Sequence, residues 1–232
     1  MWDIKFLVKE FLHSKSFQEF VNKCFKDKNK VIVDKEYLTY LVMKTGDLFY
    51  PSESLITVTS VYQEYKFDDI QRDDIVIDIG ACIGGFSIPA SRMSDYVYAV
   101  EPIMAEELRR NIILNKRNIQ VIEAALGKGD IIEAKWNHHY KSVKSMTLSD
   151  IKSFCGGCDF LKVDCEGNEW LIKPEELNGI RRIEMEVHKI PGLKGGKPFT
   201  EMENMLYKAG FNYKVDSSRS YAGTWIVHGT RE

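Results

Sequence analysis

The sequence has no long apolar run and no marked excess of either charge. Its cysteines are few and odd in number. Its first segment, MWDIKFLVKEFL, mixes charged residues with apolar ones, so we expect neither a signal peptide nor a membrane span there. Five cysteines are an odd number in a chain of 232 residues, which is long enough to fold without disulfide bonds and fits a reducing compartment. We therefore expect a cytoplasmic protein without disulfides.

The charges are almost balanced, with 32 basic and 34 acidic residues. This balance argues against the positive field that is typical of nucleic-acid-binding proteins, so small or weakly charged substrates are favoured. Hydrophobic residues make up 44% of the chain and charged residues 28%, which is an ordinary globular composition. We interpret two lysine-rich stretches, 23–30 and 188–197, as solvated surface.

The first 50 residues are predicted to form an extension. Apolar residues recur with helical spacing over 1–30, and the capping-box spacing of Ser16 and Glu19 predicts a break between two helices there. Short β-type runs follow at 31–33, 37–43 and 55–62. We therefore divide the chain into an N-terminal helical extension, 1–50, which is a candidate substrate cap, and a main domain, 51–232.

From residue 74, apolar strand-like runs alternate with helical stretches, which is typical of parallel strands joined by crossover helices. Two β-rich segments without a helix between them predict a final antiparallel hairpin. The expected fold is α/β, a doubly wound Rossmann-like sheet of seven strands. The predicted strands are 75–79, 96–100, 119–123, 159–164, 181–187, 211–215 and 223–229, and the predicted helices are 84–93, 103–115, 168–173 and 199–209.

The run VIDIGACIGGF, 76–86, is a predicted strand that contains Asp78 near its end and leads into a glycine-rich turn. Turns of this kind bind ligands at the carboxyl edge of a doubly wound sheet, and Gly80 and Gly84 would let a ligand approach the backbone. The spacing GxxxGG differs from the GxGxxG of dinucleotide sites, and Asp78 favours an ammonium or sulfonium ligand. Glu101 follows the next strand, where a carboxylate can accept hydrogen bonds from ribose hydroxyls.

Acidic residues also accompany two later strands. Asp164 and Glu166 follow the strand in DFLKVDCEGNEW, 159–170, and should face the same crevice as the glycine turn. In IEMEVHK, 183–189, alternation places Glu184, Glu186 and His188 on one side of a central strand. Carboxylates on a buried side need a partner or a function, and Asp164 is the strongest catalytic candidate of the set.

In chain order, DIGACIGGF, AVEP, EAALG, SMTLSDI and FLKVDCEGNEW resemble the motifs of FkbM-type S-adenosylmethionine-dependent methyltransferases. The resemblance implies the class I methyltransferase fold, S-adenosylmethionine as cofactor, and 51–232 as the domain that binds it. It places Asp164 and Glu166 beside the transferred methyl group, Glu101 at the ribose and 123–125 at the adenine edge. The cofactor-binding residues that it implies are Asp78, Gly80, Ala81, Cys82, Gly84, Glu101, Pro102, Glu123, Ala124, Ala125 and Asp164.

Members of this family mostly methylate hydroxyl groups, so the resemblance implies O-methylation of a small molecule, a sugar or a lipid-linked glycan. The sulfonium already activates the methyl group, so the protein has to align the acceptor; Asp164 or His188 is the candidate base, oriented by Glu166. Two other functions stay open. One is an RNA methyltransferase that uses 1–50 for recognition, and the other is a non-catalytic protein that binds the nucleoside cofactor.

The segment HKIPGLKGGKPF, 188–199, combines three glycines with three lysines. Glycines permit movement and lysines attract anions, so the segment fits a lid over an anionic acceptor as well as it fits a solvated loop.

Cys155-Gly-Gly-Cys158 has the spacing of half a zinc site. We interpret it as a glycine-rich loop and predict no metal. A divalent ion held by Asp164 and Glu166 is a lesser alternative. The other conceivable zinc ligands are His138, His139 and Cys165.

Overall fold

The computed structural model describes residues 30–33, 39–50, 52, 54–188, 198–217 and 223–231. The helices predicted over 1–30 lie outside these residues, apart from Lys30, which belongs to a strand. Residues 189–197 of the predicted lid also lie outside them. No helix among the described residues is long and apolar enough to cross a membrane.

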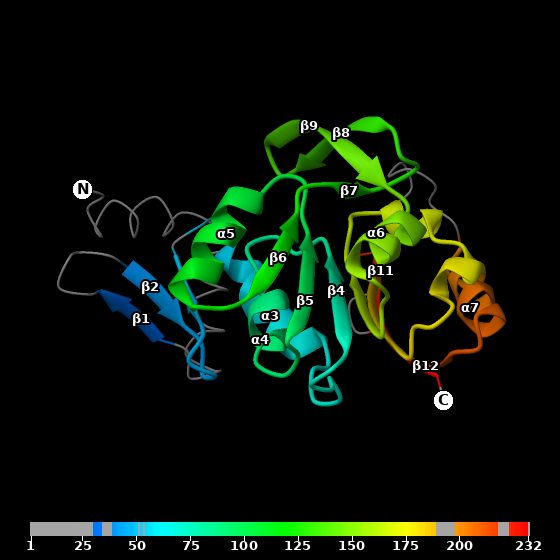
Figure 1. Cartoon of the computed structure of the whole chain (residues 1–232), viewed down its shortest axis with the longest axis horizontal. Coiled ribbons are helices and arrows are strands. Elements are labelled where there is room, and N and C mark those ends of the chain that lie inside the picture. Colours follow the sequence, from blue (N-terminus) through cyan, green and yellow to red (C-terminus); the bar gives the residue numbers. More distant parts are fainter. Residues whose placement is uncertain are drawn as a thin grey trace.

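A seven-stranded mixed sheet forms the centre of the molecule (Figure 1). Its order is β12-β13-β11-β10-β4-β5-β6, and β13 alone runs against the other strands. The doubly wound sheet with a terminal hairpin is thereby confirmed, and each strand matches its predicted range to within one residue at either end. The strands are β4 (Ile75–Ile79), β5 (Tyr96–Val100), β6 (Ile119–Ile122), β10 (Phe160–Val163), β11 (Arg182–His188), β12 (Asn212–Asp216) and β13 (Thr224–Thr230).

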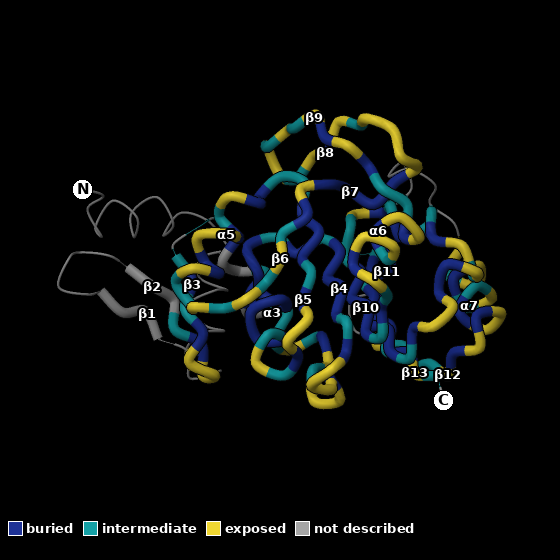
Figure 2. Tube along the Cα trace, in the orientation of Figure 1, coloured by how far each residue is buried: buried dark blue, intermediate teal, exposed yellow. Residues whose placement is uncertain are grey.

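Helices cover both faces of this sheet. Successive side chains of a strand point to opposite faces, and the apolar side chains of the central strands are buried on both. Ile77 and Ile79 of β4 pack into the cluster that contains side chains of α6 and α7. Val76 packs on the other face, against Phe86 beside α4, and Figure 2 shows that β4 at the centre of the sheet is mostly buried whereas α5 and α7 carry exposed residues. The helices are α3 (Leu55–Glu64), α4 (Ser87–Ala90), α5 (Ala105–Leu114), α6 (Leu148–Cys155) and α7 (Phe199–Lys208), with 3-10 helices η1 (Asn168–Leu171) and η2 (Pro174–Leu177).

Three predicted elements differ in type or length, one of which is the helix predicted over 168–173, observed as the short 3-10 helix η1. The run 55–62 is rich in β-branched residues and reads as a strand, yet it lies in helix α3. Val58, Val61 and Tyr65 have helical spacing and pack into the core clusters, so burial of this stripe outweighs the β propensity. The helix predicted over 84–93 shrinks to the four residues of α4, because the glycine turn occupies its first part.

Residues 124–158, for which the sequence analysis assigns no element, contain a small sheet and α6. Strands β7 (Ala125–Leu126), β9 (His139–Met146) and β8 (Ile131–Trp136) form it in that order, and it lies beyond the carboxyl ends of β4, β5 and β6 in Figure 1. Thr147 then begins α6 with a capping box that includes Asp150. The segment TLSD is therefore a helix start.

A three-stranded antiparallel sheet, β1 (Lys30–Val33), β2 (Thr39–Val42) and β3 (Leu48–Phe49), precedes α3. The side chain of Asn115 accepts a hydrogen bond from the Leu48 backbone N–H at 2.8 Å and donates to the Leu48 carbonyl at 2.7 Å. Asn111 accepts from the Tyr50 backbone N–H at 3.0 Å. These bonds attach the described part of the extension to the α5 region of the main domain.

Candidate active site

A cavity of about 700 Å³ lies at the carboxyl ends of β4, β5 and β10. Residues of α3 and of the hairpin strand β8 complete its walls. Its size is in the range of small-molecule and cofactor sites. The predicted cofactor-binding and catalytic residues that line it are Gly80, Ala81, Cys82, Glu101, Pro102, Ala124, Ala125, Asp164 and Glu166.

The glycines of the turn allow close packing within the protein itself, and Gly80 also lines the cavity. Gly80 has a φ of +75°, and a Cβ there would lie 1.7 Å from the carbonyl oxygen of Asp164. Gly84 lies outside the cavity lining, and its Cβ would lie 2.9 Å from side-chain carbons of both Ile88 and Leu108. Glycine is therefore required here so that β10 and the helices can approach the turn.

Asp78 does not face the cavity, so the prediction that it contacts a cationic ligand directly is not met. Its side chain is fully buried, accepts a hydrogen bond from the hydroxyl of Ser87 and forms an ion pair with Lys162, 3.1 Å from Nζ to Oδ1. Lys162 also donates to the carbonyl oxygen of Gly80 at 2.8 Å. The cation that Asp78 meets is therefore part of the protein and holds the glycine turn.

Lys162 is a site residue that the sequence analysis missed. It lies in the buried strand β10 between apolar neighbours, and a lysine in such a strand is itself the signal, because a buried ammonium group needs carboxylate partners. Burial alone would lower the pKa of Lys162, but the charges of Asp78 and Asp164 outweigh it and raise that pKa. Lys162 is therefore a permanent positive charge in the cavity wall.

Glu101 ties together the loops that follow β4 and β5. Its Oε2 accepts from the backbone N–H of Cys82 at 2.7 Å, and its Oε1 accepts from those of Ile103 at 2.7 Å and Met104 at 2.9 Å. Burial raises the pKa of Glu101, although the three N–H donors favour its charged form. Because each carboxylate oxygen has two lone pairs, Oε2 has capacity for one hydroxyl in addition to the Cys82 bond.

At the predicted adenine edge, only the two alanines line the cavity. Ala124 and Ala125 are buried in its wall. Glu123 is exposed and lies outside the lining, with its carboxylate bonded to Lys141 at 2.5 Å and to Arg109 at 3.0 Å. The hydrogen bonds from these two cations lower the pKa of Glu123. Glu123 thus belongs to a surface ion-pair network, which corrects its expected place at the cofactor.

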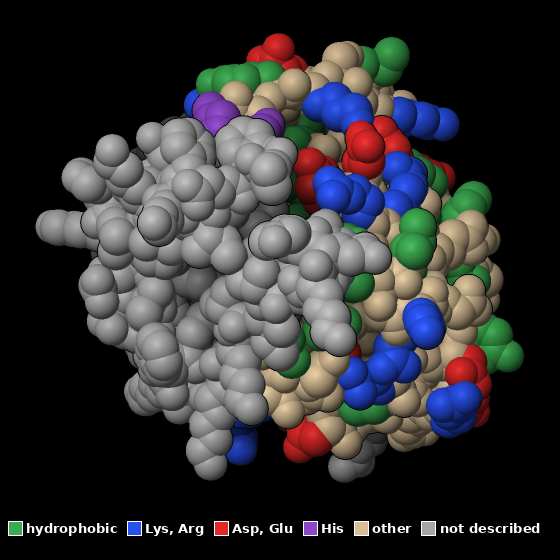
Figure 3. Space-filling view, turned by 90° about the vertical axis from the view of Figure 1, so that its left-hand side faces the viewer, with side chains coloured by type: hydrophobic (Ala, Val, Ile, Leu, Met, Phe, Trp, Pro, Cys, Tyr) green, Lys and Arg blue, Asp and Glu red, His purple; other side chains and the backbone are tan. Residues whose placement is uncertain are grey.

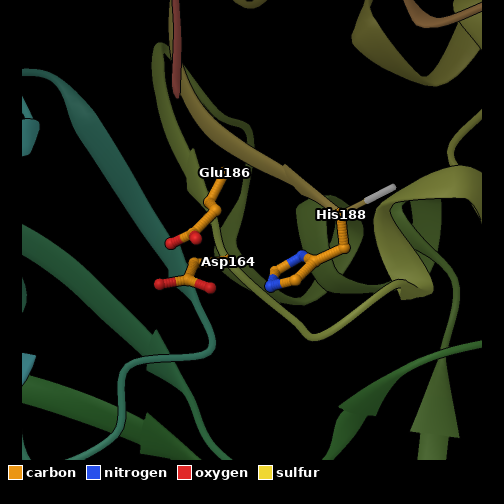
Figure 4. A group of neighbouring side chains, drawn as sticks. All are labelled: Asp164, Glu186 and His188. Atoms are coloured by element: carbon orange, nitrogen blue, oxygen red, sulfur yellow. The ribbon is translucent and has the colours of Figure 1, made fainter. Parts of the chain in front are cut away.

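Asp164, Glu186 and His188 converge at one point, with ligand atoms that all lie within 4.8 Å of one another. Figure 4 shows the three side chains pointing toward each other from β11 and from the end of β10. The hydroxyl of Tyr65 donates to Oδ2 of Asp164 at 3.2 Å. Glu184, on the same side of β11, lies outside the lining and pairs with Arg182 and His228.

His188 is held by Glu169, the fully buried acid of η1. One oxygen of Glu169 accepts from the backbone N–H of His188 at 2.7 Å and lies 3.1 Å from Nδ1, while Nε2 lies 3.5 Å from Glu166. Burial alone would lower the pKa of His188, but the bond to Glu169 and the charges of the surrounding acids raise it to about 9. The surrounding acids thus favour the protonated form of His188, and its role as a base stays a prediction.

Strained backbone also gathers at this cavity. Cys82, Asn137 and Glu166 have φ values of 49°, 50° and 55° and all line it, and among the described residues only Lys116 shares this conformation without being glycine. Non-glycine residues with positive φ are uncommon and cluster at functional sites.

The CxxC segment is a structural turn. Cys155 and Cys158 are buried in the main apolar cluster, burial raises the pKa of Cys155 to about 12, and Gly156 ends α6 with a φ of 83°. Within the part of the chain that the structure describes, the one group of three potential metal ligands is Asp164, Glu186 and His188. It contains neither these cysteines nor Glu166.

The cavity fits S-adenosylmethionine by charge and by chemistry. Its lining contains six acidic residues and two lysines, an excess of negative charge that suits a ligand with a sulfonium and an ammonium group. Glu101 can accept a ribose hydroxyl, and Ala124 and Ala125 offer an apolar wall to a nucleobase. The lining acids are Glu64, Glu101, Glu133, Asp164, Glu166 and Glu186.

Comparison with known proteins places the chain in a family. The model of the methyltransferase FkbM domain matches residues 78–213, which is more than half of the chain, whereas a search of curated proteins gives no match. A solved precorrin-6y C5,15-methyltransferase from Geobacter metallireducens GS-15 is 17% identical with a TM-score of 0.51, over 79% of this chain and 94% of that one. A magnesium protoporphyrin IX methyltransferase from Synechocystis PCC 6803 with bound S-adenosylmethionine is 14% identical with a TM-score of 0.46, over 100% and 99%. With its sheet order and its cavity, the chain belongs to the FkbM methyltransferase family and is an S-adenosylmethionine-dependent methyltransferase.

Proposed function

We propose that the protein methylates a hydroxyl group of a small molecule, a sugar or a lipid-linked glycan. The observation that carries the proposal is the pair of carboxylates, Asp164 and Glu186, that meet in the cavity wall at the ends of adjacent parallel strands. S-adenosylmethionine supplies an activated methyl group when it is bound. A hydroxyl acceptor has to lose its proton during transfer, and a carboxylate within hydrogen-bond reach can accept it.

Asp164 is the better placed of the two to act as the base or to orient the acceptor. It follows β10, the neighbour of β4, and its backbone N–H bonds to the Ile79 carbonyl at 2.9 Å, so its position is tied to the strand that leads into the glycine turn. Tyr65 bonds to Oδ2, and Oδ1 can accept from the acceptor hydroxyl. Alignment of the acceptor with the methyl group is then set by the rigid strand ends.

The remaining wall of the cavity suits a polyhydroxylated acceptor. Trp136 of β8 is half-buried there, and the neighbouring Lys135 and Asn137 are polar. On the α3 side, Thr57 and Ser60 add hydroxyl groups to the lining. An aromatic ring beside several hydrogen-bonding side chains is a surface on which a sugar ring can stack and bond.

The charges on one face of the molecule bear on the RNA alternative. On the described part of the face in Figure 3, Lys and Arg side chains lie among Asp and Glu side chains. A binding surface for RNA requires a basic stripe that follows the phosphates. We therefore rank an RNA acceptor below a small hydroxylated one.

The test is turnover with defined acceptor pools. The purified chain is incubated with S-adenosylmethionine and with sugars, glycans, small hydroxylated metabolites or RNA, and products are screened by mass spectrometry for one added methyl group. We expect Asp164→Asn to bind S-adenosylhomocysteine like the wild type in calorimetry and to lose activity by about 100-fold or more. Methylation of RNA alone, or full turnover by Asp164→Asn, would overturn the proposal.

A further inference from the structure

The group formed by Asp164, Glu186 and His188 has the composition of an open metal site. Two carboxylates and one imidazole come from two adjacent strands, and their ligand atoms lie within 4.8 Å of one another. Around a tetrahedral ion with ligands at about 2.1 Å, the ligand atoms lie roughly 3.4 Å from each other. Side-chain movements that shorten the longest of these distances by about 1.4 Å would therefore close the group around an ion.

The imidazole is oriented as a metal-ligating histidine usually is. Nδ1 of His188 lies 3.1 Å from Oε1 of Glu169, and because a carboxylate only accepts, Nδ1 carries a hydrogen. Nε2, which lies 3.5 Å from Glu166, is then the ring nitrogen that remains to bind an ion. Metal-bound histidines commonly donate their other ring N–H to a carboxylate in this way, which fixes the ring and its tautomer.

Glu169 is placed to support His188 and not to bind the ion itself. It is fully buried and also accepts from the backbone N–H of Gly167 at 2.8 Å and of His188 at 2.7 Å. The turn that contains Glu166 and the end of β11 are thus fixed to each other through one carboxylate.

The charge at this point also calls for a cation. Asp164, Glu166, Glu169 and Glu186 surround the ring of His188 or lie beside it. Among the described residues, Lys162 lies 3.1 Å from Asp78 and 3.8 Å from Asp164, so its charge is largely matched by Asp78. A metal cation bound among these carboxylates would offset their negative charge.

We propose that Asp164, Glu186 and His188 bind one divalent first-row transition-metal ion, such as Mn²⁺ or Zn²⁺. A mixed set of two oxygens and one nitrogen suits these ions, whereas Mg²⁺ and Ca²⁺ prefer oxygen ligands alone and softer ions prefer thiolates. This proposal differs from the prediction from the sequence that no metal is bound. It also differs from the lesser alternative, a divalent ion held by Asp164 and Glu166, because Glu186 and His188 take the place of Glu166.

Three protein ligands leave coordination positions open, as in catalytic rather than structural sites. Asp164 and Glu186 line the cavity, so an open position would face the bound acceptor and hold its hydroxyl oxygen in place. This orienting role rests on the proposed function, whereas binding of the ion does not.

Titration with Mn²⁺ tests the site directly. The full chain is stripped with EDTA and titrated with MnCl₂ without cofactor or acceptor, and free Mn²⁺ is followed by electron paramagnetic resonance. We expect one bound ion per chain, displaced by Zn²⁺ more readily than by Mg²⁺. Glu186→Gln should weaken binding by at least 10-fold, and Glu169→Gln by roughly 10- to 100-fold although it removes no ligand.

Glu133→Gln is the matched control, because Glu133 also lines the cavity but lies on β8, and its affinity for Mn²⁺ should equal that of the wild type. Absence of stoichiometric binding to the wild-type chain would overturn the proposal without any appeal to a variant. Equal affinity of Glu186→Gln and the wild type would overturn the assignment of ligands. Either result is independent of the methyl acceptor and therefore leaves O-methylation to its own test.

Discussion

Replacement of Lys162 by methionine tests the inference that this lysine holds the glycine turn. Lys162 and Asp78 are register partners on β10 and β4, both are almost completely buried, and Lys162 also donates to the Gly80 carbonyl. Lys162→Met keeps most of the side-chain volume but leaves the Asp78 carboxylate buried without its cation. Removing one partner of a buried pair costs about 3–5 kcal/mol.

Such a loss is a large part of a typical folding free energy of about 5–15 kcal/mol. With a urea dependence of roughly 2–3 kcal/mol per molar, the unfolding midpoint of Lys162→Met should fall by about 1–2 M. Urea unfolding followed by circular dichroism measures this shift. Adding Asp78→Asn should recover about 1–3 kcal/mol, because it removes the uncompensated charge.

Two results would refute this reasoning. The first is a Lys162→Met variant whose stability lies within about 0.5 kcal/mol of the wild type, as is usual for surface changes. The second is a double variant in which Asp78→Asn lowers the free energy of unfolding by as much as it does in the wild type. Such additivity is expected only of residues that do not interact.

Three further predictions concern the loops and a buried thiol. Gly80→Ala should destabilise the protein by about 2–5 kcal/mol in urea unfolding, because its Cβ would overlap the Asp164 carbonyl and its φ is positive; a loss below 1 kcal/mol would contradict the close approach. Glu101→Gln should weaken S-adenosylhomocysteine binding in calorimetry by roughly 10- to 100-fold, because an amide cannot accept all three backbone N–H bonds; unchanged affinity would exclude that role. Burial raises the pKa of Cys155 to about 12, so only about one thiol in ten thousand is ionised at pH 8. Alkylation of Cys155 by iodoacetamide at pH 8, read by peptide mass spectrometry, should be far slower in the native protein than in urea and should accelerate as pH rises. Equal rates would be inconsistent with burial.

The central strands are predictable because their signal is local. β4 and β5 are short apolar runs bounded by polar turns, and their ends agree with the prediction. The hairpin of β8 and β9 escapes prediction because much of it is exposed and an exposed strand has no buried face to mark it. Helix α3 is misread because its β-branched residues suggest a strand, while its burial comes from packing against distant parts of the chain.

In the candidate site, too, features with a local sequence signal are predictable and features that depend on distant parts of the chain are not. Glu101, Asp164 and Glu166 could be predicted because residues that follow parallel strands face one crevice, and the structure places all three in the cavity lining. The pairing of Asp78 with Lys162 depends on the register of two strands that are 84 positions apart, which no local pattern contains. The same holds for the meeting of Asp164 with His188, and for the raised pKa of His188 that follows from its neighbours.

The hairpin of β8 and β9 leaves and rejoins the domain at almost the same place. Leu126 and Met146 are paired across β7 and β9, and the backbone N–H of Gly127 bonds to the Met146 carbonyl at 2.8 Å. A segment whose two ends are adjacent can be lengthened, shortened or exchanged without disturbing the sheet. Since residues of β8 line the cavity, the range of acceptors can diverge through this one segment while the methyl-transfer machinery stays constant, and hairpin exchange is a direct route to redesigned specificity.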